Sequence, residues 1–341
     1  MKLLVTGGAG FIGSNFILYW LNKYPEDQIV NLDKLTYAGN LENLKSVEKH
    51  PPYKFIKSDV CDQKLVGQIV KDVDMIVHFA AESHVDRSIT DPAPFIQTNI
   101  VGTHVLLESA LKYSIKRFHH ISTDEVFGEL PLTSKDKFNE LTPYNPRSPY
   151  SASKAASDHL VRAYYHTYGL PMTISNCSNN FGPYQFPEKA LPLLMTNALE
   201  EKPFPLYGSG ENVRDWIYVL DHAKAISFLI RKGNVGEIYN IGGTYSAQNK
   251  ILFTKILELM QKPASLLHIV ADRPGHDKRY ALNCDKLKRL GWSPETPFEA
   301  ALEQTINWYC ERTDWWQPLK YGTDFQHYYT SQYASRAMKT S

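Results

Sequence analysis

Short apolar runs alternate with amphipathic stretches through the first half of the chain. These runs lie at 3–6, 29–33, 54–59, 75–81 and 118–123, and they contain β-branched residues, which favour strands. Strands that alternate with helical patterns predict parallel βαβ units. The pattern therefore predicts an α/β protein built on a doubly wound parallel sheet.

Two long helices are expected to pack against this sheet. The segment 94–113 carries apolar residues at the i, i+3, i+4 and i+7 spacing of a helix face. The second helix should begin near Ser148, which can cap it, with Pro149 at the first helical position. Gly169 should end this helix, and the apolar run 172–175 should form a sixth strand.

The sequence pattern changes after the sixth predicted strand, where prolines interrupt the alternation of strands and helices. We assign residues 1–176 to a first domain, to which segments near 215–243 return. Residues 177–214 and 244–320 are assigned to a smaller, mixed α/β substrate-binding lobe. Residues 321–341, rich in Tyr, Ser and Gln, are expected to be a loosely held C-terminal tail.

A glycine-rich turn follows the first strand directly and opens a helix. Gly7 allows the tight turn, Gly10 the close approach of a pyrophosphate, and Gly13 the packing of helix on strand. Asp33 ends the second strand about 20 residues later, where it can bind ribose hydroxyls and repel a 2′-phosphate. This combination predicts a Rossmann-like site for NAD rather than NADP. Asp59, after the third strand, either contacts the adenine or caps a helix.

Two groups of polar residues could carry chemistry at the same edge of the sheet. Tyr150 and Lys154 lie four apart on one helix face, so that the ammonium, together with the positive ring of a bound nicotinamide, can lower the pKa of the phenol and make it a base. Thr123, Asp124 and Glu125 end the fifth strand, and two carboxyl groups beside a hydroxyl suit acid-base catalysis. Taken alone, the first pair could be a surface pair and the second a solvated loop.

Several longer strings carry a family resemblance. They are TGGAGFIG (6–13), LDKLTYAGN (32–40), HFAAESHVDRSI (78–89), STDEVFG (122–128), YSASK (150–154), NCSNNFGPYQFPEKALP, PLYGSGENVRDW and DRPGHDKRYA. In these strings the chain resembles the dTDP-glucose 4,6-dehydratases of the extended short-chain dehydrogenase family, over residues 1–320. The resemblance favours a catalytic role for both groups of polar residues.

The resemblance implies a reaction in which NAD is used and regenerated. Tyr150 would take the proton of the C4 hydroxyl while hydride passes to NAD, and Lys154 would hold the ribose. Glu125 would remove the C5 proton, Asp124 would protonate the departing C6 hydroxyl, and Thr123 would polarise the C4 ketone. Hydride would then return to C6, giving a 4-keto-6-deoxy sugar nucleotide.

The resemblance also implies binding residues. Further cofactor contacts would come from Phe11, Ile12, Lys34, Val60, Ala81, Ser83, Thr98 and Ser122. Substrate contacts would come from Ser83, His84, Asn180, Glu188, Lys189, Tyr207, Arg214, Asn249, Arg273 and His276. Within this second set, Asn180 and the two arginines are expected to hold the diphosphate, and Tyr207 to stack on the base.

The charge balance, the cysteine content and the length of the apolar runs exclude some classes of protein. The 341 residues carry 37 basic and 36 acidic side chains, which gives no electrostatic reason to bind nucleic acid. The four cysteines are far apart and lack metal-binding spacing, so we expect reduced thiols, no metal and a cytoplasmic protein. No apolar run is long enough to span a membrane. A homodimer through the two long helices is implied by resemblance only.

Three alternatives remain at this stage. A UDP-glucose 4,6-dehydratase would share every motif, because the sequence does not distinguish thymine from uracil. A nucleotide-sugar 4-epimerase would share the glycine turn and the tyrosine-lysine pair but would not need Asp124 and Glu125. A dinucleotide-binding sensor without catalysis would need none of these polar groups.

Overall fold

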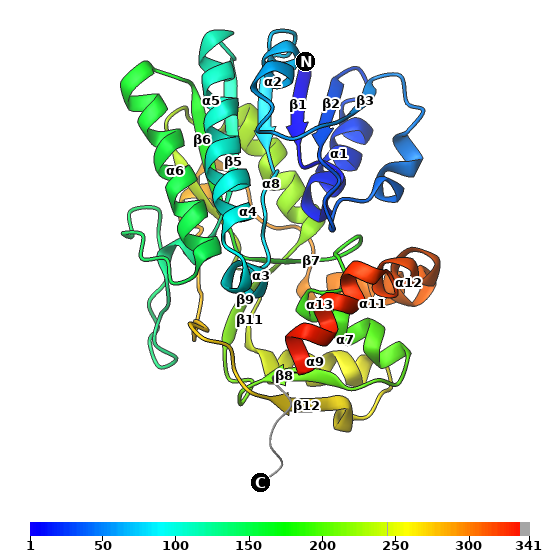
Figure 1. The fold of residues 1–341 in the computed structure, drawn as a ribbon. Helices are drawn as coiled ribbons and strands as arrows, with labels where there is room; N and C mark the ends of the chain where they lie inside the picture. The colour runs from blue at the N-terminus through cyan, green and yellow to red at the C-terminus, as the bar shows by residue number, and fades with distance from the viewer. Residues whose placement is uncertain (244, 335–341) are drawn as a thin grey trace.

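A seven-stranded parallel sheet forms the centre of the computed structural model, which describes residues 1–243 and 245–334 (Figure 1). The strand order is β10-β6-β5-β4-β1-β2-β3, and every pair is parallel. The chain winds outwards from β1 in both directions, which confirms the predicted doubly wound sheet. The strands are β1 (Lys2–Thr6), β2 (Gln28–Asp33), β3 (Tyr53–Lys57), β4 (Met75–His78), β5 (Arg117–Thr123), β6 (Met172–Cys177) and β10 (Ile238–Ile241).

Helices cover both faces of the sheet (Figure 1). Successive residues of a strand point to opposite faces: Leu3 and Val5 pack with Phe16 of α1, whereas Leu4 packs with Leu106 of α5. Each face therefore has its own apolar core. The covering helices are α1 (Phe11–Lys23) and α8 (Val219–Lys232) on one face, and α2 (Gln63–Val70), α5 (Thr103–Lys112) and α6 (Pro149–Tyr168) on the other.

Helix α6 begins and ends where the sequence predicted. The Ser148 side chain accepts a hydrogen bond from the Ser151 backbone N–H, and the Ser151 side chain accepts one from the Ser148 N–H, which forms a capping box. Pro149 occupies the first turn, and Gly169 ends the helix with φ of 72°. These local signals fix the position of Tyr150 on the first turn of the helix.

The segment expected to form one regular helix over 94–113 is helical but not regular. It consists of α4 (Ala93–Phe95), a π-helical segment η2 (Ile96–Gly102) and α5. The π turn is associated with Asn99, whose side chain hydrogen-bonds both backbone groups of Glu82 and the Ser153 hydroxyl. A pattern of apolar positions cannot reveal such a widened turn, because the turn depends on contacts with a distant loop.

A second region lies below the sheet in Figure 1. Its largest sheet is mixed, because β7 runs parallel to β9 and β11 runs antiparallel to it. Trp315 and Trp316 are buried in its core. The elements are β7 (Asn179–Phe181), α7 (Ala190–Leu199), β8 (Phe204–Tyr207), β9 (Val213–Tyr218), β11 (Tyr245–Gln248), α9 (Asn249–Leu259), η4 (Ala264–Leu266), β12 (Leu267–Val270), α11 (Phe298–Glu311) and α12 (Thr313–Lys320). Helix α10 (Asp285–Leu290), which the sequence assigned to this lobe, packs instead on β10 of the main sheet, with Leu287 buried in its core. The short elements η1 (Leu41–Val47), α3 (Val85–Thr90) and η3 (Asp124–Phe127) connect strands of the main sheet.

The expectation of a loosely held tail is wrong for residues 321–334. Helix α13 (Thr323–Ala334) packs on the second region, with Phe325 buried and Tyr329 stacked on its ring. Aromatic residues drive this packing, because each ring removes a large apolar area from water. Residues 335–341 of the expected tail lie outside the described residues.

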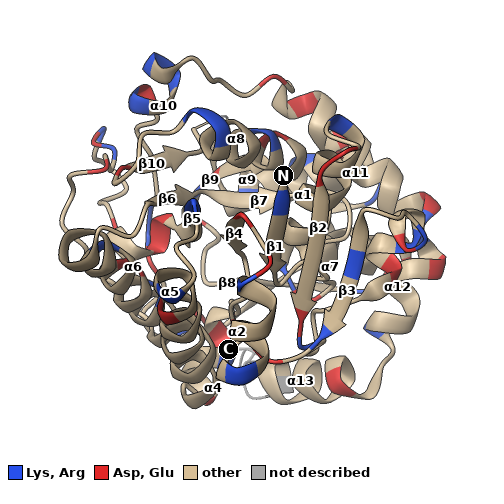
Figure 2. Ribbon diagram, turned by 90° about the horizontal axis from the view of Figure 1, so that it is seen from above, with Lys and Arg blue, Asp and Glu red and all other residues tan. Residues whose placement is uncertain are grey.

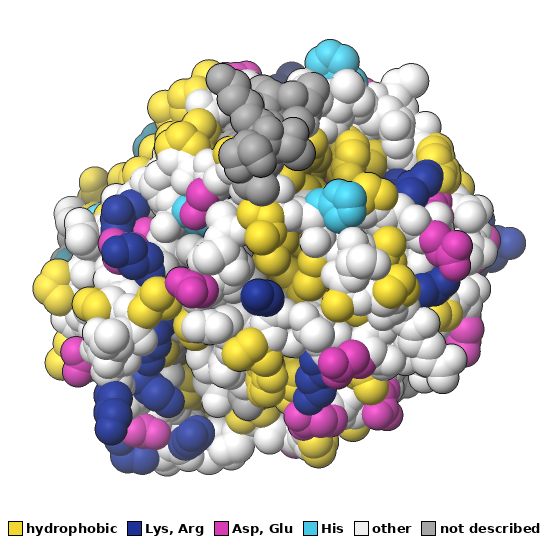
Figure 3. All heavy atoms as spheres, turned by 90° about the horizontal axis from the view of Figure 1, so that it is seen from below, with side chains coloured by type: hydrophobic (Ala, Val, Ile, Leu, Met, Phe, Trp, Pro, Cys, Tyr) yellow, Lys and Arg dark blue, Asp and Glu magenta, His cyan; other side chains and the backbone are white. Residues whose placement is uncertain are grey.

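The described helices include none that is long and apolar enough to cross a membrane. Basic and acidic residues are distributed over all layers of the molecule (Figure 2). The face around β8 and β12 likewise carries hydrophobic, basic and acidic side chains close to one another (Figure 3).

Candidate active site

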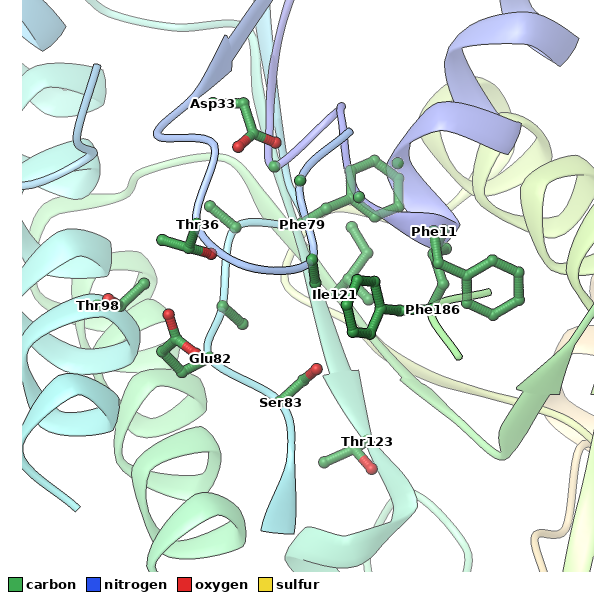
Figure 4. A pocket seen from close by; sticks show the side chains of 18 of the residues that line it. Phe11, Asp33, Thr36, Phe79, Glu82, Ser83, Thr98, Ile121, Thr123 and Phe186 are labelled. Carbon is green, nitrogen blue, oxygen red and sulfur yellow. The ribbon is translucent and has the colours of Figure 1, made fainter. Parts of the chain in front are cut away.

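A cavity of about 300 Å³ lies at the carboxyl ends of the parallel strands, where open α/β sheets bind ligands. Loops after β1, β2, β3 and β4 and the ends of β5 and β6 contribute to its walls (Figure 4). Every cofactor residue predicted from the sequence lines this cavity: Gly7, Gly10, Phe11, Ile12, Gly13, Asp33, Lys34, Asp59, Val60, Ala81, Ser83, Thr98, Ser122, Tyr150 and Lys154.

The glycine turn has the geometry of a phosphate cradle. Gly7 has φ of 70°, and a Cβ there would lie 2.5 Å from the backbone N of Ala80. A Cβ on Gly13 would lie 2.4 Å from the Gly7 carbonyl oxygen, whereas one on Gly10 would meet only that oxygen, at 3.3 Å. The absence of a side chain at Gly10 therefore leaves room in the cavity. It also starts α1 without a side-chain cap, so the first backbone N–H groups of the helix remain available to an anion.

Asp33 is held in one orientation by backbone donors. Its two carboxylate oxygens accept hydrogen bonds from the N–H groups of Ala9 and Leu35, at 2.9 and 2.8 Å. Burial raises the pKa of Asp33, and these two donors oppose the shift. Lys34 and Asp59 form an ion pair of 2.7 Å beside it, on the same wall of the cavity.

The two predicted catalytic groups meet at the opposite end of the cavity. Tyr150 and Lys154 line it from α6, and Thr123 and Glu125 line it from the end of β5 and from η3. The Lys154 ammonium donates a 2.7 Å hydrogen bond to the Ile121 carbonyl, which fixes it against β5. The structure thus brings one phenol, one ammonium, one hydroxyl and one carboxyl group to a single cavity.

The protein's own residues do not lower the pKa of Tyr150. Burial and the charge of Glu125 raise the pKa of Tyr150 well above its usual value, and a hydrogen bond with Thr123 opposes the shift only in part. Lys154 is itself buried, and burial lowers its pKa. The sequence argument counted the neighbouring ammonium but not the loss of water around both groups.

Asp124 occupies a different position from Glu125. It is 2% exposed and lies off the cavity lining, where its Oδ1 accepts a 3.3 Å hydrogen bond from the Thr123 hydroxyl. Among the described residues, none donates to its Oδ2. Burial and the charges of Glu125 and Asp215 raise its pKa well above the usual value. Burial also raises the pKa of Glu125, although the charges of nearby arginines oppose it.

Behind Lys154 lies a buried polar cluster that the sequence did not predict. His120 lies 3.4 Å from the Lys154 ammonium and 3.2 Å from Asp158. The Asp158 carboxylate also accepts hydrogen bonds from Ser122 and Tyr144, at 2.7 and 2.9 Å. Burial raises the pKa of Asp158 to about 6. This cluster supports Lys154 from the core side of α6.

The predicted substrate residues fall into two sets. Those that line the cavity are Ser83, Thr123, Asn180, Glu188 and Lys189. Those that lie off its lining are His84, Tyr207, Arg214, Asn249, Arg273 and His276. The Lys189 ammonium donates to the Ser83 carbonyl at 2.9 Å, which joins the loop after β4 to the segment before α7. The Asn180 Oδ1 accepts a 2.8 Å hydrogen bond from Nδ1 of the His222 ring.

Two residues of the second set, Arg273 and Tyr207, contact Asp86 in α3. The Asp86 carboxylate accepts hydrogen bonds from Arg273 at 3.1 Å and from the Tyr207 hydroxyl at 2.8 Å. Tyr207 therefore makes a polar contact here, with its ring edge-on to His276 rather than stacked. Arg214 lies apart, with its guanidinium 4.4 Å from the Tyr280 ring centroid and hydrogen-bonded to the Asp277 carbonyl.

Arg87, the next residue of α3, joins three segments. Its guanidinium lies 4.0 and 4.2 Å from the ring centroids of Tyr37 and Tyr328, so it is held between two aromatic faces. It also donates two hydrogen bonds to one oxygen of Glu188, at 3.0 and 2.8 Å. We call Arg87, Tyr37, Tyr328 and Glu188 the arginine clamp. The clamp links the loop after β2, the segment before α7 and helix α13.

Several cavity residues were missed by the sequence analysis. They include Thr36, Tyr37, Phe79, Glu82, Ile121, Cys177, Gln185 and Phe186. Tyr37 and Phe186 contact each other edge to face, at 5.5 Å between ring centroids. A partial signal existed, because Tyr37 follows Asp33 closely and Phe186 lies in the proline-rich segment after β6. Among the described residues, no group of three or more His, Cys, Asp or Glu side chains could hold a metal ion.

A family model and a relative of similar sequence both carry the name of a 4,6-dehydratase. A model of the family described as GDP-mannose 4,6 dehydratase matches residues 4–305. A dTDP-glucose 4,6-dehydratase of Escherichia coli is 50% identical over 353 residues, which covers 95% of this chain and 97% of that protein.

Two solved structures are similar to this chain in fold and sequence. A dTDP-glucose 4,6-dehydratase from Streptomyces venezuelae, determined with NAD and TYD bound, superimposes with a TM-score of 0.91 at 46% identity, covering 94% of this chain and 100% of that one. A UDP-glucose 4-epimerase from Thermus thermophilus, in complex with NAD, has a TM-score of 0.84 at 29% identity, covering 92% and 100%. The chain is thus more similar to the dehydratase than to the epimerase in both fold and sequence.

Proposed function

The chain belongs to the GDP-mannose 4,6-dehydratase family, and from this membership we propose that it is an NAD-dependent hydro-lyase that converts dTDP-glucose to dTDP-4-keto-6-deoxyglucose. One observation carries the proposal: Thr123, Glu125, Tyr150 and Lys154 line the cavity that the glycine turn opens. An epimerase would not require the two carboxyl groups beside Thr123.

The residues of the cavity fit a dinucleotide. Gly10 and the uncapped start of α1 would hold the pyrophosphate, and the fixed Asp33 carboxylate would accept hydrogen bonds from the adenosine ribose. When bound, NAD would take up hydride from C4 of the sugar and give it back at C6. Its positive ring would also favour the Tyr150 phenolate, which the protein's own residues do not.

Tyr150 would take the proton of the C4 hydroxyl, while Lys154 would hold the ribose and orient the phenol. Thr123 would donate a hydrogen bond to the developing C4 ketone. The hydrogen bond of Lys154 to Ile121 supports this role, because it fixes the ammonium one helical turn from Tyr150.

Glu125 would remove the proton from C5, and Asp124 would protonate the departing C6 hydroxyl. Their surroundings support this division of roles. The raised pKa of Asp124 favours a carboxyl group that carries a proton at neutral pH, as an acid must. Burial raises the pKa of Glu125 as well, but the charges of Arg273 and Arg214 oppose this shift, so Glu125 ionises more readily than Asp124, as a base requires.

The substrate would extend from this chemistry towards the second region. Ser83, Glu188 and Lys189 would contact the hexose, with His84 beside them, and Asn180, Arg214 and Arg273 would hold the diphosphate. Tyr207, Asn249 and His276 would lie near the nucleoside.

We also propose a cytoplasmic homodimer. The described cysteines Cys61, Cys177, Cys284 and Cys310 are all free, as in a reducing compartment. Ile96 is 53% exposed and Val101 37% exposed along η2, one of the two helical segments proposed for the interface. Apolar side chains on a long helical face suit association with a second copy. Ile96→Glu should convert the dimer to a monomer in light scattering, and an unchanged mass would exclude this interface.

The test of the function is a side-by-side assay with dTDP-glucose and UDP-glucose. Purified protein should convert the first to a product lighter by one water, seen by mass spectrometry and by the ultraviolet absorbance of the ketosugar in alkali. Preferential turnover of UDP-glucose would keep the reaction but change the nucleotide. No loss of water with either sugar would overturn the proposal.

A further inference from the structure

We propose that Asp158 is a positioning residue, whose carboxylate is the counter-charge that keeps the Lys154 ammonium in place and protonated. Asp158 lies on α6 but off the cavity lining, so it acts through Lys154 rather than on the sugar. The inference rests on the proposed function, because it concerns the lysine that serves the oxidation at C4.

The spacing along α6 puts the two charges next to each other. Tyr150, Lys154 and Asp158 follow one another at intervals of four residues, and residues four apart are neighbours on one helix face. Tyr150 and Lys154 line the cavity, whereas Asp158 is 0% exposed. The row of three side chains therefore leads from the cavity into the core, and a carboxylate stands at its buried end.

One ring nitrogen contacts both charged groups. Nε2 of His120 lies 3.4 Å from the Lys154 nitrogen and 3.2 Å from Oδ1 of Asp158. The ammonium also donates a 2.7 Å hydrogen bond to the Ile121 carbonyl. These contacts with β5 hold the ammonium close to the Asp158 carboxylate.

The surroundings of Asp158 keep it ionised. Its Oδ2 accepts hydrogen bonds from the hydroxyls of Ser122 and Tyr144, at 2.7 and 2.9 Å. Among the described residues, none donates a hydrogen bond to Oδ1, the oxygen that faces His120. Burial raises the pKa of Asp158 to about 6, and the charge of Lys154 and the two hydroxyl donors oppose the rise. The carboxylate therefore carries its charge at neutral pH.

The neighbouring titratable groups do not supply this negative charge. Burial lowers the pKa of His120 well below its usual value, so its ring is neutral. Burial raises the pKa of the Cys177 thiol to about 12, so the thiol is neutral too. Burial also lowers the pKa of Lys154, and the charge of Asp158 opposes that shift. The described groups that face the pair are His78 on β4, His120 on β5, Cys177 on β6, Tyr144 in the segment before α6 and His159 on α6.

The test removes the charge of Asp158 with little change of shape. Asp158→Asn and Asp158→Glu are compared with wild type by competitive labelling of Lys154 with acetic anhydride, which reacts only with the unprotonated amine. Peptide mass spectrometry then gives the pKa of Lys154 in the free protein. We expect Asp158→Asn to lower this pKa by about 1 pH unit or more, because an opposite charge within about 4–6 Å has an effect of that size. Asp158→Glu, which keeps the charge, should lower it far less.

The pH profile of the first chemical step gives a second readout. In a Glu125→Gln background, where oxidation at C4 is expected to remain, stopped-flow absorbance follows the reduction of NAD by dTDP-glucose as a function of pH. The alkaline limb, where Lys154 loses its proton, should move to lower pH in Asp158→Asn. The acid limb, where Tyr150 gains a proton, should move the same way by less, because Tyr150 lies one helical turn further from the lost charge. Of the two acids that face Tyr150, this background leaves Asp124, which is the same in all variants.

Each outcome decides the role of Asp158. A slower reduction of NAD with an unchanged lysine pKa and unmoved limbs would mean that Asp158 only supports packing, and would overturn the proposal. An equal fall of the lysine pKa in Asp158→Asn and Asp158→Glu would overturn it too, since the second variant keeps the charge. Wild-type protein that forms no dehydrated product would instead refute the proposed function, and the labelling would still decide the role of Asp158. If Asp158→Asn does not fold, as judged by circular dichroism, Asp158→Ser supplies an uncharged variant that can still accept a hydrogen bond from Tyr144.

Discussion

The two ends of the cavity are built in different ways. The cofactor end uses backbone groups and glycines that follow β1 and β2 directly, so its geometry is determined by short stretches of chain. The substrate end uses charged side chains that pair across long separations, such as Arg87 with Glu188 and Arg273 with Asp86, 101 and 187 residues apart. A local motif therefore specifies the first end, whereas only the complete fold specifies the second.

The largest expected effect on turnover comes from Glu125, which lies between the cofactor end and the substrate end of the cavity. Glu125→Gln should lower turnover by about 100-fold or more, because the amide cannot accept the C5 proton. NAD binding and partial oxidation at C4 should remain, since the cofactor end does not use this carboxylate. Stopped-flow absorbance of the reduced cofactor and product analysis would show this split. Glu311→Gln, an exposed change on α11, is the matched control. Unchanged turnover would remove Glu125 from the mechanism.

Gly13→Ala tests whether the cofactor end tolerates any side chain at its tightest point. The new Cβ would lie 2.4 Å from the Gly7 carbonyl, so the turn must shift. We expect NAD affinity to fall about tenfold or more, with a loss of about 1–3 kcal/mol in stability. Calorimetric titration with NAD and thermal unfolding would measure both. Gly67→Ala in α2, whose nearest neighbours are 3.9 Å away, should be neutral or stabilising.

Arg273→Ala tests the substrate end. We expect KM for the nucleotide sugar to rise about tenfold, since a hydrogen bond to a charged group contributes about 1.5–3 kcal/mol. The kcat should fall by less, because Glu125 loses one of the charges that favour its ionised form. Steady-state kinetics would measure the split. Arg279→Ala, which removes an exposed guanidinium nearby in sequence, should leave KM unchanged. If Arg273→Ala lowers kcat and leaves KM as it was, the residue does not serve in binding.

The smallest effect is expected from Arg87→Lys in the arginine clamp. Lysine keeps the charge but loses the flat guanidinium that contacts both tyrosine rings, at a cost of about 1 kcal/mol. The melting temperature should fall slightly, and protease should cleave α13 sooner. Arg312→Lys, a substitution at an exposed ion pair, provides the comparison. Equal cleavage rates in the two variants would show that the clamp does not hold α13.

The parts of the molecule that could be predicted are those determined by residues close together in the sequence. Ser148, Pro149 and Gly169 determine the limits of α6 through local hydrogen bonds and backbone preferences, and this placed Tyr150 and Lys154 correctly on one helix face. The order of apolar and amphipathic segments likewise predicted the doubly wound sheet, because parallel strands need long crossover connections.

The remaining parts depend on contacts that no local pattern contains. The π turn at Asn99 follows from its bonds to Glu82 and Ser153, and α13 follows from burial of its aromatic rings on a distant core. The rise that burial causes in the pKa of Tyr150 was not foreseen, because burial is a property of the folded chain. Arg87 was not recognised, since nothing in its sequence neighbours indicates Tyr328.

Helix α13 has a consequence for the order in which a newly made chain becomes competent. Tyr328 lies against His84, 244 residues earlier in the sequence, and against Arg87. The strands β1 to β6 can pair while the ribosome is still translating the second region, because domains fold from the N-terminus as they emerge. The contacts of α13 with His84 and Arg87 must wait until residues 323–334 have been made. A nascent chain can therefore hold a folded sheet well before the arginine clamp is complete.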